Sequence, residues 1–185
     1  MKNILKNSLC YLCGPIDNAA DQGKTWRTET IKRYKKMNIK FLDPTNKLRG
    51  LVKEVDDEQE KIRKYKREGR WEELSKMMKG VVHQDLRVCD YVDFMIAYVD
   101  TSIHMCGSYH EIITATIQKK PVFIVVEGGK KNASSWLFGI CDHNYMFDNF
   151  DELYKYLDGI NSGKIKLSDR WVLIRNQLQT KKVIK

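Results

Sequence analysis

The segment Cys106-Gly107-Ser108-Tyr109-His110-Glu111 carries the residue types and spacing best suited to chemistry. Two interpretations of its last residue stay open. Ser108 and Glu111 match a capping box, in which the two side chains bind backbone N–H groups at the start of a helix. Alternatively, a carboxylate at a helix N-terminus is kept ionised by the partial positive charge there. Glu111 can then act as a nucleophile that forms a covalent intermediate.

Other motifs with catalytic or cofactor-binding roles fail on their spacing. Gly23-Lys24-Thr25 is similar to the end of a phosphate-binding loop, but the glycine required five positions earlier is Asn18. The sequence contains no G-x-G-x-x-G, no H-E-x-x-H and no serine nucleophile elbow. Cys10 and Cys13 are three apart in a predicted strand, so their thiols face opposite sides of a sheet, and no second cysteine pair completes a zinc site. The sequence therefore predicts no cofactor and no metal.

Short apolar runs alternate with helix-like segments, which is typical of βαβ units and of a parallel sheet covered on both faces. The predicted strands are Leu9–Cys13, Ile39–Leu42, Val92–Val99, Pro121–Val126 and Tyr145–Phe147. Predicted helices lie around residues 31–37, 108–119, 151–157 and 170–178. We therefore predict one α/β domain over residues 1–185, with a flavodoxin- or Rossmann-like parallel sheet of about five strands and helices on both faces.

A long charged stretch separates the second and third predicted strands. Residues 52–80 form a predicted helical insertion that Gly69 interrupts, giving two helices or one broken helix. Basic and acidic residues are interleaved along it, as on a solvated face. The chain as a whole lacks the clustered basic and aromatic pattern typical of nucleic-acid-binding proteins, so we expect no nucleic-acid partner. A second addition, residues 168–185, is a predicted helical tail.

The composition predicts a cytoplasmic globular protein. The 185 residues carry a formal net charge of +9, which suits a phosphorylated small substrate as well as nucleic acid. No apolar run reaches the roughly 20 residues of a membrane-spanning helix, and the N-terminus lacks the apolar stretch of a signal peptide. Five cysteines without a framework spacing indicate reduced thiols.

In an open parallel sheet, ligands bind beyond the carboxyl ends of the strands, and the notable residues of this chain fall there. The ordered motifs are Tyr11-Leu12-Cys13-Gly14-Pro15, Asp85-Leu86, Gly107-Ser108-x-x-Glu111, and Ala115 through Lys120-Pro121. With these motifs, residues 8–160 resemble the nucleoside 2-deoxyribosyltransferase family and its 2′-deoxynucleotide N-hydrolase relatives.

The resemblance implies an enzyme that cleaves or transfers the N-glycosidic bond of a 2′-deoxynucleoside or its 5′-monophosphate. It assigns Glu111 as the nucleophile of a covalent intermediate, Asp85 as the general acid for the leaving base, and Tyr11 as the donor that orients Glu111. It places Asn132 at the sugar site of a neighbouring subunit, so we expect a homo-oligomer with shared active sites. The implied substrate-binding residues are Gly14, Pro15, Asp17, Gly107, Ser108 and Asn132.

One position departs from the family pattern. Six residues before the nucleophile, where the family often has an Asp that binds sugar hydroxyls, this chain has Met105 with His104 beside it. His104, Ser108 or a backbone group can replace that contact, so this position leaves open whether the substrate is a nucleoside or its 5′-monophosphate. The sequence as a whole also leaves open whether the sugar is transferred to a free base or hydrolysed. Asn132 also suits a turn. The alternative function is a non-catalytic nucleotide-binding or sensing module on the same fold.

Overall fold

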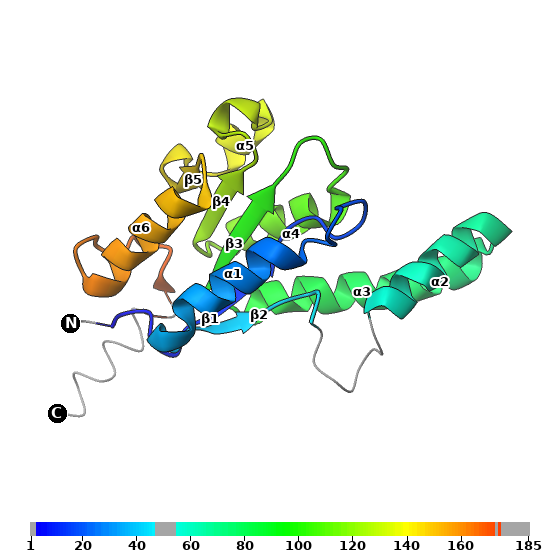
Figure 1. Ribbon diagram of the computed structural model, residues 1–185, viewed down its shortest axis with the longest axis horizontal. Helices are drawn as coiled ribbons and strands as arrows, with labels where there is room; N and C mark the ends of the chain where they lie inside the picture. The colour runs from blue at the N-terminus through cyan, green and yellow to red at the C-terminus, as the bar shows by residue number, and fades with distance from the viewer. Residues whose placement is uncertain (1–2, 47–54, 173, 175–185) are drawn as a thin grey trace.

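The computed structural model describes residues 3–46, 55–172 and 174. Five parallel strands form one sheet in the order β2-β1-β3-β4-β5 (Figure 1). The strands are β1 (Leu9–Cys13), β2 (Lys40–Leu42), β3 (Phe94–Val99), β4 (Val122–Val126) and β5 (Met146–Phe147). The predicted α/β fold with a five-stranded parallel sheet is confirmed.

Helices cover both faces of the sheet, because each parallel strand must be linked to the next by a crossover. They are α1 (Lys24–Tyr34), α2 (Val55–Glu68), α3 (Trp71–Tyr91), α4 (Cys106–Ile117), α5 (Ser135–Ile140) and α6 (Phe150–Ser162). Short 3-10 helices are η1 (Lys35–Met37), η2 (Lys130–Asn132) and η3 (His143–Tyr145). Helices α1 and α6 pack on one face, and α3, α4 and α5 contribute to the core on the other.

Side chains of β1 alternate between these two cores, since successive residues of a strand point to opposite faces. Cys10 and Leu12 pack with α1 and α6, whereas Tyr11 and Cys13 pack on the side of α3 and α4. The prediction that Cys10 and Cys13 face opposite sides is confirmed. All five cysteines are unpaired, as predicted.

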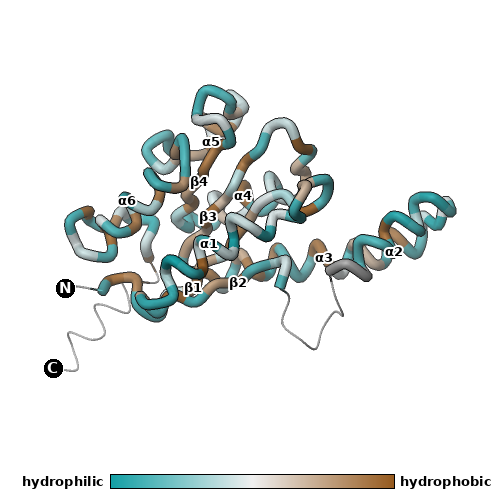
Figure 2. Tube along the Cα trace, viewed as in Figure 1, coloured by the Kyte–Doolittle hydropathy of each residue, from teal (hydrophilic) through white to brown (hydrophobic). Residues whose placement is uncertain are grey.

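The charged insertion forms a helical hairpin of α2 and α3 that projects from the body of the molecule (Figure 1). At its turn Gly69 has a φ of 66°, a conformation that glycine adopts without strain, so the predicted interruption is confirmed. Hydrophilic residues dominate the hairpin (Figure 2), although Ile62 of α2 is buried. Helix α3 runs without a break past residue 80, the predicted end of the insertion. The insertion therefore shares one helix with Asp85.

Other element boundaries differ from the predictions. Helix α4 begins at Cys106, two residues before the predicted start, and α6 continues to Ser162. Helix α5 was not predicted, because six residues are too few to show a helical period. The predicted tail helix over residues 170–178 lies largely outside the described residues. Among the helices described, none has the length and apolar character needed to cross a membrane.

Candidate active site

A buried arginine fixes the loop that follows β1. The Arg27 guanidinium donates hydrogen bonds to the backbone carbonyls of Leu12 (3.1 Å), Gly14 (2.9 Å) and Gly23 (2.7 Å). It also lies 3.7 Å from the carboxylate of Asp43, just after β2. Burial lowers the pKa of Arg27, but a guanidinium stays charged in proteins. The loop after β1 is thus tied to both α1 and the end of β2.

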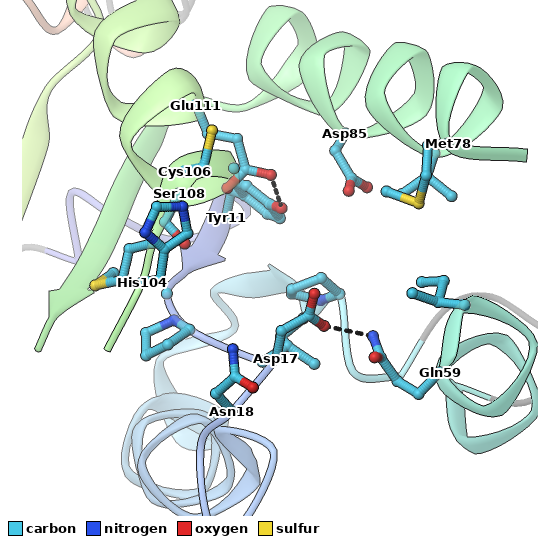
Figure 3. A pocket seen from close by; sticks show the side chains of 18 of the residues that line it. Tyr11, Asp17, Asn18, Gln59, Met78, Asp85, His104, Cys106, Ser108 and Glu111 are labelled. Atoms are coloured by element: carbon cyan, nitrogen blue, oxygen red, sulfur yellow. Dashed lines mark hydrogen bonds between the residues drawn. The ribbon is translucent and has the colours of Figure 1, made fainter. Parts of the chain in front are cut away.

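Two residues of β1 hold the carboxylate of Glu111. The Tyr11 hydroxyl donates to Oε1 (2.9 Å) and the Cys13 thiol donates to Oε2 (3.0 Å). Tyr11 and Cys13 are two residues apart, so they share the face of the strand on which α4 packs. Each oxygen of the buried carboxylate therefore accepts one hydrogen bond, and Figure 3 shows the bond from Tyr11.

Glu111 does not cap α4. It is the sixth residue of the helix, in the second turn, and no side chain caps the helix start. The capping-box interpretation of Ser108 and Glu111 is wrong, because the helix begins at Cys106 and the carboxylate binds β1 instead. The helix N-terminus was also expected to keep the Glu111 carboxylate ionised. This expectation does not hold, because the partial positive charge of a helix N-terminus acts mainly within the first turn.

The environment of Glu111 raises the pKa of its carboxyl group. Burial is the largest cause, and the charge of Asp85 acts in the same direction. The hydrogen bonds from Cys13 and Tyr11 and the charge of Arg27 oppose the rise. The carboxylate is therefore a stronger base than a solvated one, and it is ionised only above this raised pKa.

Asp85 reaches the same cleft from α3. Its carboxyl group points from α3 into the space beside Tyr11 and Glu111 (Figure 3). Because its charge contributes to the raised pKa of Glu111, the two carboxyl groups interact electrostatically. The prediction that Tyr11, Asp85 and Glu111 meet at the carboxyl ends of the strands agrees with this geometry.

The cleft has a volume of about 290 Å³ and lies beyond the carboxyl ends of β1 and β3. Five predicted substrate-binding residues line it: Gly14, Pro15, Asp17, Gly107 and Ser108. The α2–α3 hairpin adds residues that the sequence analysis missed: Gln59, Ile62, Lys66, Met78 and Val81. The Gln59 amide donates to the Asp17 carboxylate (2.5 Å), which joins the loop after β1 to α2 (Figure 3). Nowhere in the described ranges do three or more His, Cys, Asp or Glu side chains gather as a metal site would require.

The start of α4 supplies polar groups at one end of the cleft. Met105, at the position of the family's Asp, is buried, and its Sδ accepts a hydrogen bond from the backbone N–H of Asp100 (3.3 Å). His104 and Ser108 both line the cleft. Ser108 as a residue is largely buried, but its hydroxyl is not among the enclosed polar atoms, and no hydrogen bond of that hydroxyl is found within the described part of the chain. His104, Ser108 and the first N–H groups of α4 thus remain available to a ligand.

Asn132 lies outside this cleft. It ends η2, after β4, and its exposed side-chain amide donates to the carbonyl of Glu127 (3.1 Å). That contact suits the turn interpretation. The expected contact with the sugar site of a neighbouring subunit stays a prediction.

No protein-family model and no curated protein matches the sequence, but solved structures match the fold. The 2-deoxyribosyltransferase of Bacillus psychrosaccharolyticus aligns with a TM-score of 0.50 and 11% identity, over 79% of this chain and 90% of that chain. The 2-deoxyribosyltransferase of Leishmania mexicana aligns with a TM-score of 0.50 and 14% identity, over 80% and 95%. A CMP N-glycosidase of Clostridium botulinum aligns with a TM-score of 0.45 and 13% identity, over 81% and 98%. The first two similarities show that the chain has the 2-deoxyribosyltransferase fold.

Proposed function

We propose that this protein cleaves or transfers the N-glycosidic bond of 2′-deoxynucleosides or their 5′-monophosphates through a covalent deoxyribosyl intermediate on Glu111. One observation carries the proposal: a buried carboxylate, hydrogen-bonded on both oxygens, borders a cleft into which the carboxyl group of Asp85 also points. Retaining glycosidases divide the nucleophile and acid roles between two such carboxyl groups. The shared fold supports the substrate class.

In the first step, the Glu111 carboxylate attacks C1′ of the sugar. The bond from C1′ to the base nitrogen breaks, its electron pair stays with the base, and Asp85, which enters this step in its protonated form, donates that proton to the leaving base. Tyr11 keeps the carboxylate in position for attack. This step yields a glycosyl ester of Glu111, a free base and an ionised Asp85.

In the second step, water or a second base attacks C1′ of the ester. The ester bond breaks, its electron pair returns to the Glu111 carboxylate, and Asp85 takes the proton that the incoming group loses. Water gives hydrolysis to the free sugar or sugar phosphate. A second base gives a new nucleoside or nucleotide.

The direct test is incubation of the purified protein with nucleosides and 5′-monophosphates, with and without a second free base, followed by chromatography of the bases. We expect release or exchange of the base from 2′-deoxy substrates. Ribo substrates should react about tenfold more slowly or worse, which corresponds to ~1.4 kcal/mol in the barrier. A 2′-hydroxyl crowds the attack and disfavours the oxocarbenium-like transition state. Equal or faster reaction of ribo substrates would remove the deoxyribosyl assignment.

Cys106 provides a binding readout that separates this enzyme from a binding or sensing module. It lines the cleft and is exposed, whereas the other four cysteines are buried. A bound nucleoside or nucleotide should therefore protect Cys106 from iodoacetamide, as measured by mass spectrometry. Protection by substrates that never lose their base would indicate the binding module and contradict the proposed reaction.

Ser108 indicates a preference for 5′-monophosphates. A helix N-terminus with unbound N–H groups favours an anion, and the Ser108 hydroxyl lacks a partner in the described structure. A hydrogen bond to a charged group contributes about 1.5–3 kcal/mol. We expect Ser108→Ala to lower kcat/KM for monophosphates by about tenfold or more while leaving unphosphorylated nucleosides nearly unaffected. Ser162→Ala on α6 is the control, and equal losses on both substrate types would assign Ser108 another role.

Asn132 enters the proposal through assembly. Its exposed side chain lies outside the cleft of its own chain, as a contact with a neighbouring subunit would require. We propose a homo-oligomer in which Asn132 serves the sugar site of that neighbour. We also propose a cytoplasmic location, because five cysteines that are all unpaired are typical of proteins in a reducing compartment.

A further inference from the structure

Cys13 contacts Glu111 from the side of the core. Its side chain is fully buried and does not line the cleft, whereas Tyr11 does. The thiol lies 3.0 Å from Oε2 of Glu111 and 3.5 Å from the backbone carbonyl oxygen of Ser108. Both neighbours are acceptors, so the thiol can act toward them only as a donor, and the carboxylate is the closer and charged one.

The thiol keeps its proton. Burial is the largest cause that raises the pKa of Cys13 well above its ordinary value, and the negative charge of Glu111 acts in the same direction. A buried, protonated thiol is a poor nucleophile and metal ligand. Donation of the S–H group is therefore the chemistry that this position offers.

We propose that Cys13 is a positioning residue for the nucleophile: its S–H group holds Oε2 of Glu111 toward the core, so that Oε1, beside Tyr11, faces the cleft. The inference rests on the proposed function, because it gives the proposed nucleophile a second partner. With Tyr11 alone, the carboxylate could still rotate about a single hydrogen bond. Two donors on two oxygens fix its plane, and a fixed nucleophile needs less reorganisation during attack.

The bond also affects ionisation of Glu111. The groups that face Glu111 are Tyr11 and Cys13 from β1, Arg27 from α1, and Asp85 and Cys89 from α3. A hydrogen bond to the charged form favours that form, and the bond from Cys13 lowers the pKa of Glu111. Without the thiol, Glu111 should therefore ionise at higher pH.

The test compares Cys13→Ala, which removes the donor, with Cys13→Ser, which keeps one. Cys10→Ala is the matched control, because Cys10 is equally buried on the same strand but faces the other core. We expect Cys13→Ala to lower kcat by about tenfold and to move the acid limb of the pH–rate profile to higher pH. Cys13→Ser should restore both, and Cys10→Ala should change neither. An acid limb that stays in place in Cys13→Ala would overturn the proposal.

A titration of Glu111 itself keeps this test independent of turnover. Infrared difference spectra between each protein and its Glu111→Gln form follow protonation of that one carboxyl group. The midpoint should lie at higher pH in Cys13→Ala than in wild type, and an unmoved midpoint overturns the proposal. A moved midpoint without base release from any substrate supports Cys13 as donor and contradicts the proposed function.

A third measurement needs no variant at Cys13, in case Cys13→Ala does not fold. The S–H stretching band of wild type should move to higher frequency in Glu111→Gln, because the thiol loses a charged acceptor. An unchanged band would show that the thiol does not donate to Glu111.

Discussion

Glu111→Gln should abolish turnover and keep the fold. Glutamine has nearly the same size, but its neutral amide cannot form the glycosyl ester. We expect kcat to fall by about 10⁴-fold or more, which corresponds to ~5.5 kcal/mol of transition-state stabilisation. Single-turnover release of the base measures the loss. A slowly reacting 2′-fluoro analogue should label wild type on Glu111 and leave Glu111→Gln unlabelled, as mass spectrometry of peptides can show.

Stability should respond differently from activity. Because the pKa of Glu111 is raised in the folded protein, ionising it costs more there than in the unfolded chain. The folded state therefore loses stability as the pH rises through that pKa, and glutamine removes this cost at neutral pH. The loss of one charged hydrogen bond opposes the gain, so the free energy of unfolding should change by no more than about 1–2 kcal/mol.

Glu127 provides the matched control for this substitution. Its carboxylate also accepts a hydrogen bond from a tyrosine hydroxyl, that of Tyr98 (2.6 Å), but it does not line the cleft. Glu127→Gln should keep wild-type turnover. A normal rate in Glu111→Gln would remove the nucleophile from the mechanism.

Asp85→Asn should have the second largest effect, and its size should depend on the leaving base. Removal of a general acid costs about 10²–10⁴-fold, and we expect a loss in this range for ordinary 2′-deoxynucleosides. A 7-methylated 2′-deoxyguanosine carries a positive charge on its base, so the base can leave without a proton. Its rate of base release should fall much less than that of 2′-deoxyguanosine.

Asp90→Asn is the control for Asp85, because Asp90 is an exposed carboxylate on the same helix that binds Gln118 outside the cleft (2.6 Å). It should leave both substrates unaffected. Equal losses for the methylated and unmethylated substrates in Asp85→Asn would show that Asp85 binds or positions the substrate and does not protonate the base.

The positions of the strands followed from the pattern of apolar runs along the sequence. Each of the five strands lies within two residues of its prediction, because buried parallel strands are short, apolar and bounded by polar turns. The start of α4 did not follow, since Ser108-x-x-Glu111 matches a local capping pattern. Instead, the Glu111 carboxylate accepts a hydrogen bond from Tyr11 of β1. Contacts between residues so far apart in the chain leave no signature in a short stretch of sequence.

Only part of the site was predicted, again because contacts between distant segments are not visible in the sequence. Tyr11, Asp85 and Glu111 were expected together, and the i, i+2 spacing of Tyr11 and Cys13 was available as a signal that both side chains share a face. The residues of α2 that line the cleft could not be predicted from the sequence. Which side of a charged helix packs inward depends on its contact with α3 and with Asp17, and the helix pattern leaves that undetermined.

Two elements that border the cleft, strand β1 and helix α2, differ in how much of the molecule must unfold locally before they can move. Tyr11 and Cys13 belong to β1, which is paired with β2 and β3 and buried. Gln59 belongs to α2, which is joined to the loop after β1 through the exposed carboxylate of Asp17. Local opening of α2 should therefore cost less free energy than opening of β1, and its amides should exchange hydrogen faster. We therefore expect ligand entry and exit to involve fluctuations of the hairpin, while the Glu111 carboxylate stays in the slowly exchanging centre of the sheet.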